Sequence, residues 1–251
     1  MPMVETAEGA IAFIVRGTDG VPAIFVHGAG GSHRLWGPVI AALPKTGRYY
    51  AIDLPGHGRS PGAGRRTIAG YGAAVEAFLD SQGLERAVII GHSMGGAIAL
   101  WLALERPACV TGLGLVGTSG RLRVPAWLLS GIRAEPGQTI AQLVPLLYGA
   151  QVDPAARSAI ERDLRSVAPE ILEGDYLACA GFDVLDRLGE IAVAAAVVCG
   201  AGDRMAPPEE SELLQRRLGN ATLHLVEGAG HMVMLEDPDA VAGALARLLE
   251  R

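Results

Sequence analysis

Residues 87–100 read AVIIGHSMGGAIAL, and this stretch is the strongest indication of the fold. Four apolar residues lead into the pattern Gly91-x-Ser93-x-Gly95, and an alanine-rich apolar run typical of a helix follows. A serine at a sharp turn from strand to helix needs strained backbone angles, and glycines must flank it to avoid collisions. The stretch therefore predicts that Ser93 is an exposed nucleophile at the end of a strand. The plain alternative is a glycine-rich turn that happens to carry a serine.

The composition is that of a folded domain with a large core. Of the 251 residues, 50% are hydrophobic and 19% are charged. The formal net charge is -6, and no basic stripe exists to neutralise phosphates, so we expect no nucleic-acid partner. No apolar run is long enough to cross a bilayer, and residues 1–8 lack the features of a signal peptide. We therefore expect a cytoplasmic protein with no membrane partner.

The sequence predicts neither a metal nor a cofactor. Cys109, Cys179 and Cys199 lie in apolar segments without paired spacing, which favours buried thiols over zinc ligands or disulfides. The glycine-rich segment 28–32 lacks the G-x-G-x-x-G spacing of a dinucleotide-binding turn. The expected partner is a small-molecule substrate, and the sequence leaves the oligomeric state open.

Strand-like and helix-like segments alternate along most of the chain. The alternation predicts an α/β fold: a mostly parallel, twisted sheet with helices on both faces. Helices are expected at 33–43, 67–79, after Ser93, from 208 to 218 and from 238 onward. Strands are expected at 11–16, 22–27, 47–54, 87–90, 110–116, 194–200 and 221–226.

The middle of the chain breaks this alternation. Between residues 121 and 187 helical stretches follow one another, at 140–148, 154–167 and 169–182, without strand-like runs. We therefore expect residues 1–120 and 188–251 to form one core domain, and residues 121–187 to be a helical insertion in it.

A serine hydroxyl needs a base to take its proton, and His231 is the expected base. His27 and His92 end strands beside glycines, His57 lies in a Pro-Gly-rich turn, and His224 lies inside a strand. His231 instead follows the last predicted strand, in a loop at the edge where an open parallel sheet places catalytic groups.

The base needs a carboxylate to orient it, and Asp203 occupies the corresponding loop after the preceding strand. A turn-capping role is the alternative for this residue. The order Ser93, Asp203, His231 fits the expected sheet topology. Two N–H donors must then bind the oxyanion. Met94, directly after the serine, is expected to supply one, and Ala29 in the glycine-rich loop the other.

Together these motifs make the chain similar to the α/β-hydrolase fold superfamily, in the group of serine esterases, lactonases and C–C hydrolases. The motifs that carry the resemblance are residues 27–31, 53–60, 91–96, 200–203 and 230–231. The resemblance implies that the inserted helices form a cap over the active site and that residues 53–60 are a structural loop. Haloalkane dehalogenases and epoxide hydrolases of this fold attack with an aspartate, so Ser93 excludes both.

We therefore expect a serine hydrolase that cleaves carboxylic esters of small to medium, mostly apolar substrates through an acyl-enzyme. Apolar side chains of the inserted helices are expected to line the substrate pocket. The residues predicted to bind substrate are Trp127, Leu128, Leu143 and Leu147.

Other functions fit the same residues. The triad would also serve a lactonase, a perhydrolase or a C–C bond hydrolase, and in the last of these Arg121, Arg123 or Arg133 would bind a substrate carboxylate. A function of another class is a ligand-binding receptor that uses the pocket with little turnover.

Overall fold

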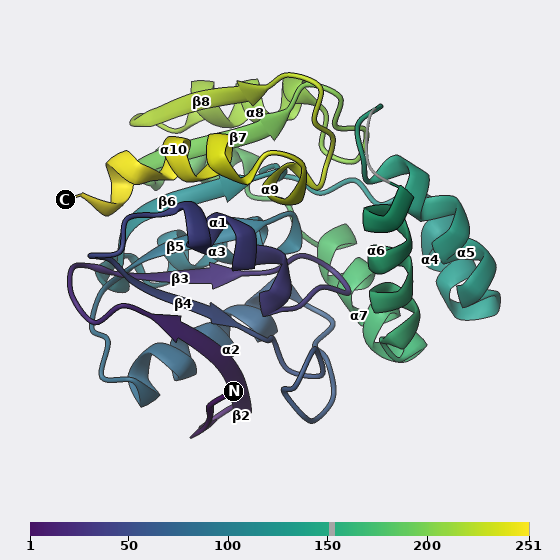
Figure 1. Ribbon diagram of the computed structural model, residues 1–251, viewed down its shortest axis with the longest axis horizontal. Helices are drawn as coiled ribbons and strands as arrows, with labels where there is room; N and C mark the ends of the chain where they lie inside the picture. Colours follow the sequence, from purple (N-terminus) through teal and green to yellow (C-terminus); the bar gives the residue numbers. More distant parts are fainter. Residues whose placement is uncertain (151–153, 251) are drawn as a thin grey trace.

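An eight-stranded, mostly parallel sheet is the middle layer of the computed structural model, which describes residues 1–150 and 154–250 (Figure 1). The strand order is β1-β2-β4-β3-β5-β6-β7-β8. Strands β3 to β8 run parallel, and β1 and β2 pair antiparallel at one edge. The strands are β1 (Met3–Thr6), β2 (Gly9–Arg16), β3 (Pro22–Val26), β4 (Arg48–Ile52), β5 (Ala87–His92), β6 (Val110–Val116), β7 (Ala194–Gly200) and β8 (Ala221–Val226).

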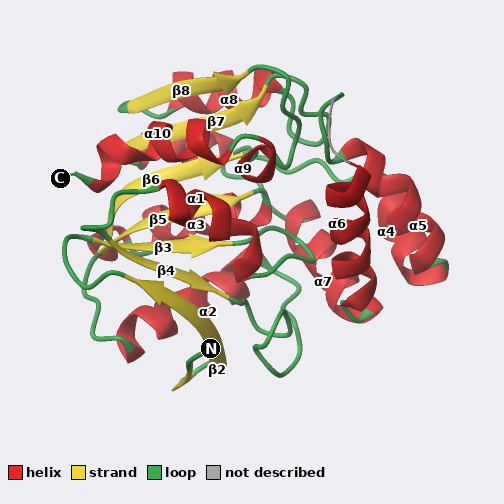
Figure 2. Cartoon of the chain, in the orientation of Figure 1, coloured by secondary structure: helices red, strands yellow, loops and turns green. Residues whose placement is uncertain are grey.

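Helices cover both faces of the sheet (Figure 2). On one face α1 (Gly37–Ala42) and α10 (Pro238–Leu249) belong to a single apolar cluster with inward residues of the strands. On the other face α2 (Ile68–Ser81), α3 (Met94–Glu105) and α8 (Pro208–Arg217) form the second cluster. Every residue of β5 and β7 is buried, as expected for strands covered on both sides. The predicted fold class is confirmed.

Local expectations differ from the structure at residues 33–43 and at the first strand. Residues 33–43 form a 3₁₀ turn, η1 (His33–Trp36), followed by the short α1, because Pro38 has no N–H to donate to the Arg34 carbonyl oxygen, which accepts from Gly37 instead. The strand β1 was not predicted, because it lies at the edge of the sheet and alternates exposed with half-buried residues. The remaining 3₁₀ turns are η2 (Pro107–Cys109), η3 (Val144–Leu146) and η4 (Leu185–Glu190).

In the described residues between β6 and β7, four helices lie beyond the carboxyl ends of the parallel strands (Figure 1). They are α4 (Ala126–Ala134), α5 (Pro136–Leu143), α6 (Pro154–Ser166) and α7 (Pro169–Ala180). The predicted helix at 140–148 instead starts at Pro136 and ends at Leu143, just before η3. The two ends of this insertion meet at its base, where Arg121 forms a bridge with Asp183.

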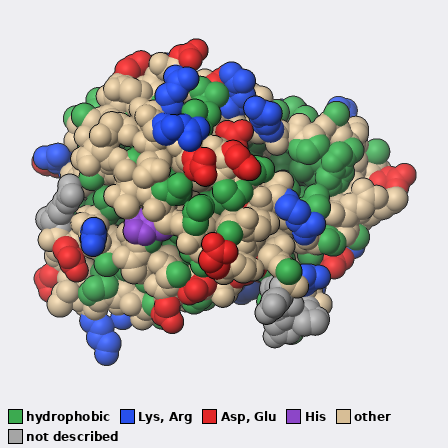
Figure 3. Space-filling view, turned by 90° about the horizontal axis from the view of Figure 1, so that it is seen from above, with side chains coloured by type: hydrophobic (Ala, Val, Ile, Leu, Met, Phe, Trp, Pro, Cys, Tyr) green, Lys and Arg blue, Asp and Glu red, His purple; other side chains and the backbone are tan. Residues whose placement is uncertain are grey.

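In the residues that the structure describes, no helix is long and apolar enough to cross a membrane. The face seen in Figure 3 carries Lys and Arg side chains interspersed with Asp and Glu. Apolar side chains gather toward the end of that face where the inserted helices lie.

Candidate active site

Ser93 occupies a strained turn between β5 and α3. Its φ of 52° makes it the one non-glycine residue with positive φ in the described part of the chain. Such a conformation is unfavourable for an L-residue and persists only where the surrounding structure imposes it. A Cβ on Gly91 would lie 2.0 Å from the Gly95 carbonyl oxygen, and one on Gly95 would lie 2.3 Å from the Val26 oxygen. The flanking glycines are therefore needed for the turn, as the sequence predicts.

His231 and Asp203 meet at the same edge of the sheet. His231 follows β8, just before the short helix α9 (Val233–Glu236), and Asp203 follows β7. The Nδ1–H of His231 donates to Oδ2 of Asp203 over 2.8 Å. Both side chains are buried, and His231 lines the same cavity as Ser93. The structure thus brings together the three residues that the sequence predicts as a triad.

The carboxylate of Asp203 is held in its charged form. Burial alone would raise its pKa, but the facing ring of His231 and hydrogen bonds outweigh that effect and keep the pKa below its ordinary value. Its second oxygen, Oδ1, accepts from the amides of Met205 at 2.8 Å and Ala206 at 2.9 Å. Because these amides fix the carboxylate, it can hold the imidazole with Nδ1 protonated, which leaves Nε2 free to accept a proton.

The predicted oxyanion donors, Ala29 and Met94, flank the serine. Met94 is the first residue of α3, so its N–H has no acceptor within the helix. Ala29 lines the cavity beside Ser93. The loop of Ala29 lies against the turn, since a Cβ on Gly28 would be 3.1 Å from the Cβ of Ser93. Both amides therefore belong to segments that adjoin the nucleophile.

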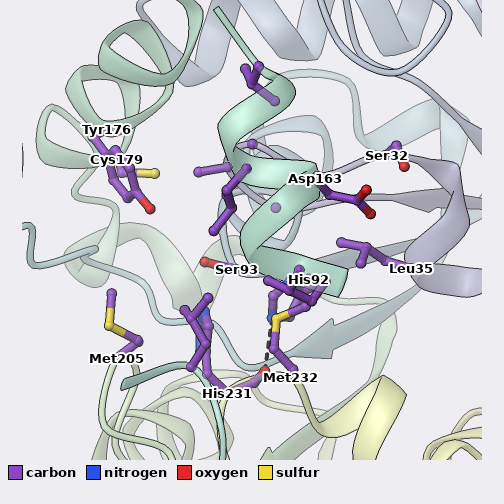
Figure 4. Close-up of a pocket in the computed structure, with 18 of the residues that line it drawn as sticks. Ser32, Leu35, His92, Ser93, Asp163, Tyr176, Cys179, Met205, His231 and Met232 are labelled. Carbon is purple, nitrogen blue, oxygen red and sulfur yellow. Dashed lines mark hydrogen bonds between the residues drawn. The ribbon is translucent and has the colours of Figure 1, made fainter. Parts of the chain in front are cut away.

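Two other buried histidines, His92 and His27, hold loops of the site by hydrogen bonds, and neither is assigned as the base. The Nε2–H of His92 donates to the carbonyl oxygen of His231 at 3.0 Å, and burial and the nearby His231 lower the pKa of His92 to about 3 (Figure 4). The Nδ1–H of His27 donates to the Gly28 oxygen at 2.8 Å. Burial and the nearby His57 lower the pKa of His27 to about 4. Both rings are neutral at physiological pH and fix loops of the site.

The loop at 53–60 is held by hydrogen bonds within the loop and by bonds from His33 and Ala12 outside it. Asp53 accepts from the amide of His33 at 2.7 Å and from the amide of Arg59 at 2.9 Å. Burial alone would raise the pKa of Asp53, but hydrogen bonds from His33 and Arg59 hold it below its usual range. The Ser60 hydroxyl donates to the Asp53 carbonyl at 2.6 Å. These contacts occupy the polar groups of Asp53 and Ser60 inside the loop.

A cavity of about 300 Å³ opens above Ser93 and His231. The inserted helices form much of its wall: Tyr176 and Cys179 of α7 lie on one side, opposite Leu35 of η1 (Figure 4). The wall is mixed, with polar and charged side chains at Ser32, His33, Arg34, Arg59, Arg123, Asp163 and Ser166 beside the apolar ones. The apolar lining includes Leu35, Leu122, Val124, Leu147, Ile160, Leu164, Val167, Met205 and Met232.

Of the four residues predicted to bind substrate, Leu147 alone lines this cavity. The other three do not line it. Trp127 is 39% exposed and borders a shallow surface hollow on the outer side of α4 and α5. Leu128 and Leu143 are fully buried, because α4 packs against α5 and α7 and the inserted helices need a core of their own.

The arginines considered for a substrate carboxylate lie at the surface. Arg121 forms an ion pair with Asp183. Arg133 is exposed, and its Nη1 lies 3.8 Å from Oε1 of Glu173. Arg123 reaches the cavity rim, but its side chain is largely exposed. No buried cation faces the apolar wall among the lining residues that the structure describes.

Sequence reasoning missed one buried group next to the site. Asp175 of α7 is fully buried and accepts a hydrogen bond from the amide of Gly30 at 2.8 Å. The signal that could have found it is its position on a buried helix face. Leu172 lies three residues before Asp175, and Tyr176 and Cys179 lie one and four residues after it; all three are buried as well. A carboxylate on the buried face of a helix needs donors from another element.

Comparison with known proteins agrees with this architecture. A family model described as the alpha/beta hydrolase family matches residues 23–244. The pimeloyl-(acyl-carrier protein) methyl ester esterase of Neisseria meningitidis serogroup B is 28% identical over 92% of this chain and 94% of its own length. The 3-oxoadipate enol-lactonase 1 of Acinetobacter baylyi is 25% identical over 90% of this chain and 87% of its own length. The crystal structure of the enol-lactonase from Burkholderia xenovorans LB400 covers 100% of both chains at 23% identity, with a TM-score of 0.92.

Proposed function

Because the chain belongs to the alpha/beta hydrolase family, we propose that it hydrolyses carboxylic esters with Ser93, His231 and Asp203 as its catalytic triad. The observation that carries the proposal is the buried His231–Asp203 pair, which shares one cavity with a serine in a strained turn. The two relatives above act, by name, on a methyl ester and an enol-lactone, and both names support ester cleavage as the reaction.

In the first half of the reaction Ser93 Oγ attacks the ester carbonyl carbon while Nε2 of His231 takes the hydroxyl proton. The carbonyl oxygen becomes an oxyanion, and the amides of Ala29 and Met94 donate to it. The C–O bond to the alcohol then breaks, and His231 returns its proton to the leaving oxygen. Asp203 keeps Nδ1 of His231 protonated throughout and stabilises the charged ring.

In the second half a water molecule takes the place of the alcohol. Nε2 of His231 accepts a proton from this water as its oxygen attacks the acyl carbon, and the same two amides stabilise the second oxyanion. The bond to Ser93 Oγ breaks, and His231 protonates that oxygen. The products are a carboxylic acid and an alcohol, and the enzyme returns to its starting state.

The cavity indicates the substrate class. A space of about 300 Å³ with a group of apolar side chains in its wall suits a small or medium uncharged acyl group, and a free small-molecule ester is the substrate we propose. In this proposal residues 121–187 act as a cap, and residues 1–120 and 188–251 as the core domain. Helices α6 and α7 supply the cap side of the cavity through residues such as Leu164 and Tyr176.

The test is turnover of p-nitrophenyl butyrate by the wild type and by Ser93→Ala. Removal of a triad nucleophile is expected to lower kcat by about 10⁶-fold. Ser166→Ala is the matched control, because Ser166 lines the same cavity and its hydroxyl donates only to the Asp163 carbonyl. The proposal is wrong if Ser93→Ala keeps wild-type activity while folded.

A lactone is the second candidate substrate, favoured by the enol-lactonase relative. A lactone is a cyclic ester, so the same attack opens the ring and leaves the alcohol tethered to the acyl-enzyme. A panel of linear esters and lactones of equal carbon number separates the two. Higher kcat/KM for the linear member of each pair supports the ester, and the reverse order supports the lactone.

A further inference from the structure

A buried carboxylate of the insertion contacts the loop that carries Ala29. Asp175 of α7 accepts from the Gly30 amide and from Nε2–H of His57, both at 2.8 Å on Oδ2. Its other oxygen accepts from the Tyr71 hydroxyl of α2. One side chain thus joins the inserted helices, the glycine-rich loop, the 53–60 loop and α2.

The glycine-rich loop also rests directly on the inserted helices. Gly30 has a φ of +65°, and a Cβ there would lie 2.6 Å from Leu164 of α6 and 2.9 Å from Leu172 of α7. The loop therefore has no room to move toward the insertion. Its one hydrogen-bonded anchor in that direction, in the described part of the chain, is Asp175.

His57 and Asp175 form a buried ion pair. Both ring nitrogens of His57 face acceptors, since Nδ1 lies 3.1 Å from the Pro55 carbonyl oxygen and Nε2 lies 2.8 Å from Asp175. Burial alone would lower the pKa of His57, but the Asp175 carboxylate and the two hydrogen bonds raise it. The neighbouring His27 is neutral, so it adds no repulsion. Burial of such a pair is favourable only where further donors satisfy the carboxylate, and Gly30 and Tyr71 do so.

We propose that Asp175 is a positioning residue for ester hydrolysis: it anchors the Ala29–Gly30 peptide and thereby aims the Ala29 N–H at the oxyanion. The inference rests on the proposed function, because the oxyanion forms only in that reaction. The Ala29 N–H lies one Cα away from the anchored peptide. On the other side of Ala29, the Gly28 carbonyl oxygen accepts from Nδ1–H of His27 and from the Gly31 amide. Asp175 holds the side that these bonds leave free, so loss of this anchor loosens the two backbone angles of Ala29. An oxyanion donor acts through its preset direction, and such loosening weakens it.

The primary variant is Asp175→Leu. Leucine has nearly the same shape but no acceptor oxygen, so Gly30, His57 and Tyr71 all lose their shared acceptor. We expect kcat for p-nitrophenyl butyrate to fall about 10- to 100-fold while KM changes less than about threefold, because the donor acts on the transition state. A boronic acid that forms a tetrahedral adduct on Ser93 should bind more weakly by a similar factor.

Two control variants distinguish an effect on the position of the Ala29 N–H from an effect on the stability of the fold. Glu173→Gln changes a carboxylate on the same helix that makes ion pairs with exposed arginines, and it should leave kcat unchanged. Tyr71→Phe removes the donor to Oδ1 and leaves the contact with Gly30, so it should lower Tm with little effect on kcat.

A second variant covers the case in which Asp175→Leu alone does not fold. The triple variant Asp175→Leu, His57→Phe, Tyr71→Phe removes the carboxylate together with both side-chain donors, so it leaves no unpaired buried charge. Its Gly30 amide has lost its acceptor, and we expect the same loss of kcat with Tm close to that of the wild type.

Amide hydrogen exchange at Gly30, measured by NMR without substrate, is independent of ester turnover. We expect exchange at least about tenfold faster in the folded variants. The inference is overturned if a folded variant keeps kcat within about twofold of the wild type, or keeps wild-type exchange at Gly30. A wild type that does not cleave esters would refute the proposed function instead, whereas exchange at Gly30 would still show whether Asp175 anchors the loop.

Discussion

Nδ1 of His231 lies 2.8 Å from Oδ2 of Asp203, although the two residues come from loops after different strands. Both oxygens of Asp203 are occupied, one by His231 and one by the amides of Met205 and Ala206. The carboxylate therefore has one orientation available, and it fixes the imidazole in the tautomer that leaves Nε2 as a base.

The first prediction follows from that pairing. Asp203→Asn should lower kcat for p-nitrophenyl butyrate by about 10⁴-fold, since an amide favours the wrong tautomer of His231. Asp183→Asn, which alters an exposed ion pair with Arg121, is the control and should leave kcat unchanged. An Asp203→Asn enzyme with more than about a tenth of wild-type kcat would contradict the assignment.

The second prediction concerns acyl-chain length. Each methylene buried in the cavity stabilises binding by about 0.8 kcal/mol, so kcat/KM should rise from acetyl to butyryl or hexanoyl esters. It should fall for long fatty acyl esters, because the cavity of about 300 Å³ is then full. The measurement is kcat/KM for a series of p-nitrophenyl esters. A flat profile, or a preference for charged acyl groups, would count against the apolar pocket.

A matched pair of variants tests which residues form that pocket. Ile160→Ala enlarges the cavity, so the preferred chain should become longer. Leu143→Ala removes a buried leucine that does not line the cavity, so it should lower Tm and leave the preferred chain length unchanged. A shift of the optimum in Leu143→Ala, with none in Ile160→Ala, would mean that the substrate lies elsewhere.

The third prediction concerns Glu236, which ties the His231 loop to the insertion. Its two oxygens accept from the amides of Gly230 and Gly149, both at 2.8 Å. Glu236→Gln leaves one acceptor oxygen, so we expect a loss of about 1–3 kcal/mol in the free energy of unfolding and a several-fold lower kcat. Glu227→Gln changes an exposed residue of the same loop and is the control. If the two variants are equally stable, the hydrogen bonds of Glu236 do not stabilise the contact between the His231 loop and the insertion.

The fourth prediction is acid destabilisation by His27 and His92. In the folded protein their pKa values are lowered to about 4 and about 3, whereas in the unfolded chain they titrate near 6.5. As the pH falls from 6.5 toward 4, the unfolded state takes up protons that the folded state does not, so stability falls. Each ring contributes on the order of 3 kcal/mol to this loss.

Calorimetry between pH 7 and pH 4 measures the effect. His92→Asn keeps a donor for the His231 carbonyl and does not titrate, so its Tm should fall less steeply than that of the wild type over this range. A variant whose Tm falls in parallel with the wild type would show that His92 does not contribute.

The sequence was sufficient for strands β2 to β8 and for the family, and the reasons are local. Strands Ala194–Gly200 and Ala221–Val226 have the predicted bounds, because the first ends on a glycine and a charged residue, Glu227, follows the second. The elbow at Ser93 combines a strand, three glycines and a helix within a few residues, so its geometry follows from the sequence. The family predicted from the motifs is confirmed by the family match.

The side chains of the insertion were harder to place from the sequence. An apolar side chain there can face either the cavity or the neighbouring helices. Leu147 faces the cavity and Leu128 faces the neighbouring helices, yet both are apolar residues on short helical segments. Their directions depend on how α4 packs against α5 and α7, which no local pattern specifies. Asp175 was missed for a related reason, since its donors Gly30, His57 and Tyr71 lie more than a hundred positions away.

The measurement that tests the central claim most directly is covalent labelling of Ser93. The enzyme is titrated with a fluorophosphonate, and the labelled peptide is mapped by mass spectrometry while residual turnover of p-nitrophenyl butyrate is followed. We predict one adduct per chain on the peptide containing Ser93, a loss of turnover in proportion to labelling, and no adduct in Ser93→Ala. Labelling at another residue, or full turnover after complete labelling of Ser93, would contradict the assignment of Ser93 as the nucleophile.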